Sequence, residues 1–400
     1  MTGTWIEVDL DAVVRNYEEV VKLLRPGARC MAVVKADAYG LGAIEVARAL
    51  ERAGCEAFAV TRLEEGLILR EHGIEGIILV LGPTSQEEWL RAINAQLQLT
   101  LSELSSIEKL NVVCSEIEQE AFQQVQVHLK LETGMGRTGF QLPEAEELST
   151  ALLKAPHIHV AGVYTHFARA AQRDRQYSLG QYERFQTFTA RLEELRIYPT
   201  WKHVCNSATF LDYPEWHHDF VRIGTLLIGH YPGPGFSSKL TLSDPWVAKS
   251  QIVHLRKVPK GTHVGYQSIY RTKAATQLAV IPVGYADGFG ITPHFIPQGW
   301  FDFLKIVVKN FLALFGFFLG QEQVELKGRR VHVAGKIGMQ LTVIEVGMQD
   351  CALGDEVQIP LRRTVANPRI PRRYRQGGQM LSDRVMKEGV LPAYTEYSLQ

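Results

Sequence analysis

Short apolar runs recur along the first 230 residues and alternate with segments whose apolar side chains lie three and four residues apart. Such an alternation predicts parallel strands joined by helices, here over residues 44–50, 63–69 and 182–195. The strand-like runs number eight. They lie at residues 30–34, 57–60, 76–81, 97–101, 125–131, 159–164, 202–204 and 220–223.

Eight strands with their helices in about 200 residues match the size of a (β/α)8 barrel. An open, doubly wound sheet is the alternative, and the strand count favours the barrel only mildly. We therefore predict an α/β fold with a TIM-type barrel over residues 9–235.

The pattern changes after a glycine- and proline-rich linker at residues 229–235. Short β-type runs follow without helical segments between them, which predicts a smaller, mostly β domain. We assign residues 1–8 and 236–375 to this domain and expect a loosely ordered tail over 376–400. The β-type runs lie at 248–258, 277–282, 330–334, 341–346 and 356–359.

Residues 300–319 interrupt the β pattern with a long apolar run. On a helix, Asp302, Lys305 and Lys309 would form one narrow polar stripe beside a broad apolar surface. The uncharged part after Asn310 is too short for a membrane span, which needs about 20 apolar residues. We expect this helix to pack onto its own domain or a partner subunit. Membrane-surface association is the less favoured alternative.

The composition narrows the functional class. The formal net charge is zero and the pI is about 7.2, so we expect no nucleic-acid partner. The five cysteines are scattered and odd in number, which indicates neither a disulfide framework nor a metal site and fits the reducing cytoplasm. Residues 1–5 show no basic region followed by an apolar core, so no secretory signal is expected.

One lysine follows the first barrel strand. Lys35 directly follows the apolar run 30–34 and precedes a glycine-rich turn at 40–42. Burial lowers the pKa of a lysine amine and suits it to Schiff-base chemistry. A lysine that extends to the surface beside an ordinary turn is the alternative, and the local pattern alone favours it. His166, Asn206 and Arg222 also stand at ends of predicted strands, where barrel enzymes place catalytic groups, and this recurrence favours catalysis.

Seven ordered segments together resemble the alanine racemase family, whose members are pyridoxal-phosphate enzymes with an N-terminal barrel and a C-terminal β domain. The resemblance runs from about residue 5 to residue 355. It implies a cytoplasmic, homodimeric alanine racemase that supplies D-alanine for the cell wall. The segments are VVKADAYGLG (33–42), HLKLETGMGRTGF (128–140), GVYTHFA (162–168), NSA (206–208), VRIGTLLIG (221–229), VGYQSIY (264–270) and IPVGYADGF (281–289).

The resemblance implies that Lys35 binds pyridoxal phosphate covalently and serves as one of two general bases. The second base is implied to be Tyr266 of the partner subunit, on the opposite face of the substrate. Without the family, a packed strand aromatic would be the preferred interpretation of this tyrosine. A free phenol, with a pKa of about 10, is a weak base. His166 and Arg222 are implied as its helpers.

Other roles are implied in the same way. Arg222 would face the pyridine nitrogen, and its guanidinium cannot accept a proton there. Arg137 and the backbone N–H of Met339 would bind the substrate carboxylate. Lys130 corresponds to a lysine that relatives can carbamylate. The implied phosphate- and cofactor-binding residues are Tyr39, Asn206, Ser207, Gly224 and Thr225.

The sequence departs from the family pattern at several positions. Glu132 replaces an aspartate, Ala171 stands where relatives often have aspartate, and Gln340 replaces an acidic residue near the implied site entrance. A Tyr-Glu pair that narrows the pocket in relatives has no counterpart after residue 354. Because this pair is absent, a racemase of broader specificity remains an alternative. A regulatory pyridoxal-phosphate-binding protein is a further alternative, although the β domain argues against it, and Arg222 disfavours a fold-related decarboxylase.

Overall fold

The computed structural model divides into two compact units, Leu10–Pro245 and Met1–Asp9 with Trp246–Gln400. We call them the barrel unit and the β unit. The boundary expected after residue 235 lies ten residues before this division. The structure describes residues 3–117, 124–233, 235–236, 240–291, 299–314, 322–385 and 393–396.

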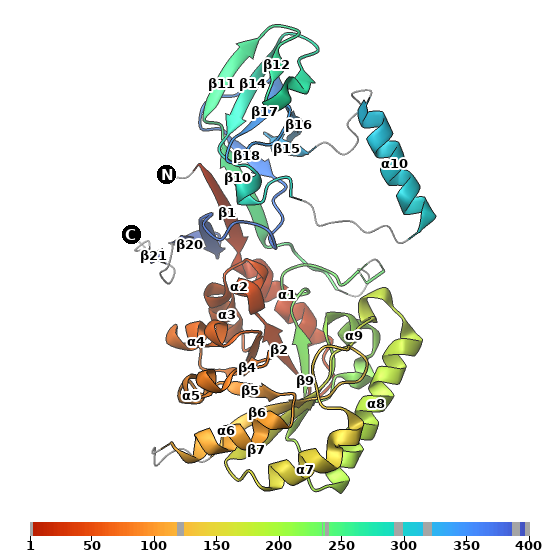
Figure 1. Ribbon diagram of the computed structural model, residues 1–400. Coiled ribbons are helices and arrows are strands. Elements are labelled where there is room, and N and C mark those ends of the chain that lie inside the picture. Colours follow the sequence, from red (N-terminus) through yellow and green to blue (C-terminus); the bar gives the residue numbers. More distant parts are fainter. Residues whose placement is uncertain are drawn as a thin grey trace. The chain divides into compact units, whose positions relative to one another are not determined.

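The barrel unit holds a parallel sheet with the strand order β8-β7-β6-β5-β4-β3-β2-β9 (Figure 1). The N–H of Arg222 in β9 donates to the carbonyl of Cys205, just after β8, at 2.9 Å, so the two edge strands lie side by side. All eight predicted strands and the barrel are confirmed. They are β2 (Arg29–Val33), β3 (Ala57–Val60), β4 (Ile77–Val80), β5 (Gln98–Leu101), β6 (Val125–Lys130), β7 (Ile158–Tyr164), β8 (Trp201–His203) and β9 (Phe220–Ile223).

Helices connect these strands around the sheet (Figure 1). The predicted helix over 182–195 begins earlier, because the Asp174 side chain accepts the N–H of Tyr177 at 3.0 Å and caps the helix there. The helices are α1 (Leu10–Lys22), α2 (Lys35–Tyr39), α3 (Ala43–Arg52), α4 (Leu63–Glu71), α5 (Gln86–Asn94), α6 (Ser105–Ser115), α7 (Ala145–Leu153), α8 (Arg175–Glu194) and α9 (Ser207–Asp212).

Alternation along the strands separates an apolar layer from a functional layer. Met31, Ala57, Leu79 and Phe220 belong to one buried cluster contributed by four neighbouring strands. Because side chains in a strand alternate between its faces, residues two and four positions further on face the same side. On β9 that position is Arg222, which lines a cavity. Lys35 and Leu81, just past the ends of β2 and β4, line the same cavity. The apolar layer therefore supports the polar groups at the C-terminal ends of the strands.

The β unit contains a sheet with the order β11-β14-β17-β16-β15-β18-β10-β1-β19-β20-β21. β1 (Thr4–Asp9) pairs antiparallel with β10 and parallel with β19, so the start of the chain forms part of this unit. The predicted run 248–258 is two strands. The strands are β10 (Trp246–Gln251), β11 (His254–Val258), β14 (Thr276–Ile281), β15 (Gln323–Leu326), β16 (Arg329–Val333), β17 (Thr342–Gly347), β18 (Glu356–Ile359) and, in a separate hairpin, β12 (His263–Val264) and β13 (Tyr270–Arg271).

The C-terminal residues differ from the expected loose tail. β19 (Arg372–Gln376) pairs with β20 (Gln379–Val385), and β20 pairs with β21 (Ala393–Glu396). Gly377 and Gly378, with φ of 59° and 76°, form the two-residue turn between β19 and β20. The basic composition with few apolar residues around β19 did not indicate a hairpin, although the Gly-Gly pair favours one. Residues 386–392 and 397–400 of the predicted tail lie outside the described part of the chain.

The helix predicted within 300–319 is present as α10 (Trp300–Leu314), and residues 315–319 lie outside the described part. Trp300 is 76% exposed and Phe311 58%, so α10 is not packed onto the described part of its own domain. The alternative expectation, packing onto a partner subunit, stays a prediction. Strand pairing runs from β14 to β17 and from β15 to β16 and β18, so the sheet is built without this insertion. Among the described residues, no helix combines the length and apolarity needed to cross a bilayer.

A buried asparagine fastens α1 to the last loop of the barrel unit. Asn16 is fully buried, and its amide nitrogen donates to the carbonyls of Leu227 at 3.1 Å and Ser243 at 2.8 Å. Its amide oxygen accepts the N–H of Ser243 at 2.8 Å. All three partners are backbone groups with few alternative partners once buried.

We expect Asn16→Ala to lower the free energy of unfolding of the barrel unit by about 2–4 kcal/mol, because it leaves buried backbone groups unsatisfied. Chemical denaturation would measure the change. Asn94→Ala, the same substitution at an exposed position of α5, should change stability by about 0.5 kcal/mol or less. Equal effects of the two variants would contradict the assignment.

Candidate active site

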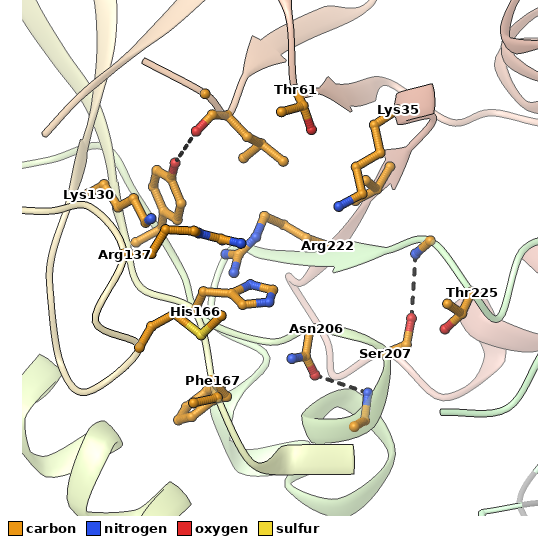
Figure 2. Close-up of a pocket in the computed structure, with 18 of the residues that line it drawn as sticks. Lys35, Thr61, Lys130, Arg137, His166, Phe167, Asn206, Ser207, Arg222 and Thr225 are labelled. Carbon is orange, nitrogen blue, oxygen red and sulfur yellow. Dashed lines mark hydrogen bonds between the residues drawn. The ribbon is translucent and has the colours of Figure 1, made fainter. Parts of the chain in front are cut away.

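A cavity of about 690 Å³ lies at the C-terminal ends of the barrel strands (Figure 2). The structure brings together in its lining every site residue predicted within the barrel unit. These are Lys35, Tyr39, Lys130, Arg137, His166, Asn206, Ser207, Arg222, Gly224 and Thr225. Ala171, one of the departures from the family pattern, also lines it.

Two predicted site residues belong to the β unit. Tyr266 begins a short turn, η4 (Tyr266–Ser268), between β12 and β13, and its side chain is 73% exposed. Met339 lies between β16 and β17 and is also exposed.

Lys35 begins α2, a short segment whose backbone is a left-handed turn and not a regular helix. The four residues after it, 36–39, have φ between 50° and 57°, although none is glycine. Left-handed backbone is costly for such residues and persists where surrounding contacts enforce it. The Ala36 N–H donates to Glu65 Oε1 at 2.6 Å, and Asp37 Oδ1 accepts the N–H of Ala43 at 2.8 Å. Both contacts fix the turn, and Lys35 is left half-buried in the cavity lining.

The same turn brings a tyrosine hydroxyl against a glycine on β9's C-terminal side. A Cβ on Gly224 would lie 2.1 Å from the Tyr39 hydroxyl, so only glycine permits this approach. Burial raises the pKa of Tyr39 to about 12, so the hydroxyl stays a neutral donor. The Gly224 N–H lies 3.4 Å from Ser207 Oγ. These hydroxyl and amide groups, with Thr225 beside them, form a cradle that fits a phosphate.

Asn206 caps α9 directly beside this cradle. Its side-chain oxygen accepts the N–H groups of Ala208 at 3.0 Å and Thr209 at 3.1 Å, as Figure 2 shows in part. With the oxygen committed to the helix, the amide nitrogen is the group that Asn206 can offer to a ligand.

Arg222 is a buried cation held by carbonyl dipoles. Its Nη1 donates to the carbonyl of His203 at 2.6 Å, and its Nη2 donates to the carbonyl of Thr165 at 2.7 Å. The guanidinium also lies 5.0 Å from the centre of the Tyr164 ring. Burial lowers the pKa of Arg222 to about 10, so it remains charged at neutral pH. A charge this deep needs such partners to offset its desolvation.

A chain of hydrogen bonds behind Arg222 sets the histidine tautomers. Arg222 Nη1 lies 2.9 Å from His203 Nδ1 and can only donate, so His203 carries its proton on Nε2. That proton is donated to His128 Nδ1 at 2.8 Å, and His128 Nε2 then donates to Gln98 Oε1 at 2.7 Å. Gly162 makes room for this chain, because a Cβ there would lie 2.3 Å from His128 Nδ1.

Sequence reasoning missed this supporting chain of Gln98, His128 and His203. A signal was present, because His128 and His203 are polar residues at inward-facing positions of apolar strands. Their meaning depends on two strands, β6 and β8, that are neighbours of β7 but distant in sequence.

The cavity is strongly cationic. Burial, and then Arg137, lowers the pKa of Lys130 to about 8, and Lys130 Nζ donates to Thr138 Oγ1 at 2.5 Å. Burial, followed by the charges of Arg222, Arg137 and Lys35, lowers the pKa of His166 to about 3. His166 is therefore a neutral imidazole. An anionic ligand would relieve the repulsion among these groups.

Glu132 organises the loop that carries Arg137. Its carboxylate accepts the N–H groups of Gly134 at 2.5 Å and Met135 at 2.6 Å. Burial raises its pKa, but the backbone donors outweigh this effect and the pKa is lowered overall. Glu132 thus shapes the loop that carries Arg137.

The residues fit pyridoxal phosphate. The cavity offers the Lys35 amine just after β2, a neutral anion-binding cradle beside β9, and the buried guanidinium of Arg222. Further cationic side chains, Lys130 and Arg137, suit a substrate carboxylate or the ring oxygen.

Comparison with known proteins agrees with this chemistry. Residues 8–232 match the model of the alanine racemase N-terminal domain, and residues 246–369 match that of the alanine racemase C-terminal domain. The chain is 36% identical over 368 residues to an alanine racemase of Desulfosudis oleivorans, covering 89% of this chain and 87% of the relative. It is 39% identical over 290 residues to one of Carboxydothermus hydrogenoformans, covering 72% and 77%.

Solved structures are similar over nearly the whole chain. An alanine racemase of Clostridium difficile superposes with a TM-score of 0.84 at 29% identity, covering 96% of this chain and 98% of that one. An alanine racemase of Bacillus anthracis with bound L-Ala-P gives a TM-score of 0.81 at 26% identity, covering 96% and 97%.

The buried histidines should make the barrel sensitive to mild acid. The pKa of both His128 and His166 is lowered to about 3, with burial as the main cause. An unfolded chain binds these protons near its ordinary pKa of about 6.5. Stability is therefore complete above that pH and is lost as the pH falls from about 6.5 toward about 3.

Denaturant unfolding between about pH 7.5 and about pH 5, above most carboxylate titrations, would measure this loss. Each histidine adds up to about 1.4 kcal/mol per pH unit to the slope. His128→Gln, which retains a donor and an acceptor, should give a shallower slope. A wild-type stability that stays flat over this range would contradict the assignment of neutral histidines.

The Gly224 cradle gives a second expectation. Gly224→Ala should displace the Tyr39 hydroxyl and weaken binding of pyridoxal phosphate by about tenfold or more, as for a lost hydrogen bond to a charged group. Fluorescence titration of the apoprotein would measure it. Gly180→Ala in α8, where the added Cβ meets nothing closer than 3.5 Å, is the matched control and should bind normally.

Proposed function

The chain belongs to the alanine racemase family, and we propose that Lys35 and Tyr266 of the partner subunit are its two acid–base groups. The enzyme interconverts L-alanine and D-alanine and depends on pyridoxal 5'-phosphate. The observation that supports the proposed roles most strongly is the cavity itself. It joins the Lys35 amine, the Tyr39–Gly224 cradle and the buried Arg222 at one end of the barrel.

Racemisation requires a proton to leave one face of the substrate Cα and another to arrive on the opposite face. Bound pyridoxal phosphate makes this proton acidic by withdrawing electrons from Cα. The Lys35 amine, which lines the cavity, would handle the proton on one face. Tyr266 of the partner subunit handles the proton on the other.

The tyrosine needs help because a phenol holds its proton tightly at neutral pH. We assign that help to His166, whose neutral imidazole can accept a hydrogen bond, and to Arg222, whose charge favours a phenolate. The lowered pKa of His166, to about 3, keeps this acceptor available across the working pH range.

Arg222 is assigned to the pyridine nitrogen. Its guanidinium carries donors alone, so it would hold a pyridine nitrogen beside it in the unprotonated form. The weaker electron withdrawal of an unprotonated ring would favour return of the proton over transamination.

The remaining roles concern binding. Tyr39, Ser207, Gly224 and Thr225 are assigned to the phosphate, with Asn206 beside them. Arg137 and the backbone N–H of the partner's Met339 are assigned to the substrate carboxylate, where a planar guanidinium fork binds well.

We propose that the enzyme acts as a homodimer with shared sites. Tyr266 is exposed on the β unit, and its turn is braced by Lys336 Nζ, which donates to Gln267 Oε1 at 2.5 Å, and by Tyr270, which donates to Glu345. A rigid, exposed tyrosine is suited to enter a site on another copy. The five free cysteines support a reducing cytoplasm as the compartment.

Mixed dimers test the shared site directly. Lys35→Ala and Tyr266→Phe should each reduce racemisation by a factor on the order of 10² to 10⁴, the usual cost of losing a general acid–base group. If the groups come from different subunits, a mixed dimer holds one doubly defective site and one intact site. Subunit exchange between the two variants should therefore restore about a quarter of wild-type activity, because about half of the dimers are mixed.

Turnover of L-alanine after dissociation and reassociation of equimolar variants would measure this recovery. Each variant taken through the same procedure alone is the control and should stay inactive. No recovery, with mixed dimers verified by differential tagging, would place both groups on one chain. Full activity in Tyr266→Phe alone would assign the second base elsewhere.

A further inference from the structure

α10 carries a broad apolar surface that is exposed in the described part of the chain. At 100° per residue, its exposed apolar side chains cover an arc of about 160°. Lys305, Lys309, Asp302 and Asn310 fall on the remaining side, together with the half-buried Ile306. The exposed apolar residues are Trp300, Phe301, Phe303, Leu304, Val307, Val308 and Phe311.

The dimensions of this surface indicate what can cover it. Helix pairing covers a narrow seam, which would leave much of so wide an arc in water. A bilayer surface covers half of a helix at once. With 15 residues the helix is too short to cross the hydrocarbon core, for which about 20 are needed, so it would lie in the plane of the interface.

The side-chain chemistry agrees with a lipid interface. Three of the exposed apolar residues are phenylalanines and one is a tryptophan, and aromatic rings favour the level of the headgroups. One aspartate and two lysines give α10 a net charge of +1. Lys305 Nζ lies 3.6 Å from Asp302 Oδ1 and 4.5 Å from the centre of the Phe301 ring, at the border of the apolar arc. A lysine there can reach an anionic headgroup while its stem stays in apolar surroundings.

We propose that α10 docks the enzyme onto the surface of an anionic phospholipid bilayer. Trp300 and Leu304 lie near the middle of the arc and enter the interface, while Lys305 and Lys309 contact the headgroups. Docking at the cytoplasmic leaflet would concentrate a D-alanine-producing enzyme at the membrane without any change in its catalytic residues.

Vesicle binding by the full-length holoenzyme tests the proposal. The protein should co-sediment with vesicles of equal parts phosphatidylglycerol and phosphatidylcholine, and more weakly with pure phosphatidylcholine. Leu304→Glu should lower the partition coefficient by about tenfold, since it removes one large apolar contact. Asn310→Glu adds the same charge at the edge of the arc instead of its middle and should retain more of the binding.

Racemisation in solution should be unchanged in both variants, which shows that they fold. Failure of the wild type to bind either vesicle would overturn the proposal, as would equal losses in the two variants. Sedimentation equilibrium tests the alternative that a second copy of the chain covers the apolar arc. If Leu304→Glu changes the oligomeric state while the wild type ignores vesicles, a second copy of the chain covers the arc instead.

Discussion

The structure of the site depends on placing a guanidinium inside a barrel. Arg222 is 4% exposed, and its partners in the described structure are backbone carbonyls and one imidazole nitrogen. Carbonyl dipoles stabilise the charge without neutralising it, so its field extends across the cavity. Burial is the first cause that lowers the pKa values of His128, His166 and His203, and the charge of Arg222 lowers them further.

The Arg222 guanidinium can only donate hydrogen bonds, and it therefore also sets the tautomers of the neighbouring histidines. From Arg222 outward, each hydrogen bond fixes the next proton, through His203 and His128 to Gln98. The barrel strands supply these residues at alternating inward positions, and Gly162 leaves the space they need. The polar layer is thus as specifically packed as the apolar layer beneath it. Among the described residues, this network holds Arg222 in place without a carboxylate partner.

The cradle formed by Tyr39 and Gly224 depends on an unusual backbone conformation. Four consecutive non-glycine residues adopt left-handed φ values to carry Lys35 and Tyr39 into one cavity, and Gly224 leaves room for the tyrosine hydroxyl. The energetic cost of such a turn is offset by Glu65 and Asp37, neither of which lines the cavity. Residues outside the site therefore determine whether the lysine and the phosphate cradle meet.

The sequence by itself predicted the eight barrel strands and a change to β structure after residue 235, because strand periodicity is a local property. Its ordered motifs also predicted the barrel residues that line the cavity. It did not reveal the left-handed turn, since Ala36 and Ala38 have no intrinsic preference for it. Nor did it reveal the β19–β20 hairpin or the exposure of α10. Tertiary structure alone decided these features and the Gln98–His128–His203 chain, because each depends on which distant strand becomes a neighbour and on what remains uncovered after the sheet has formed.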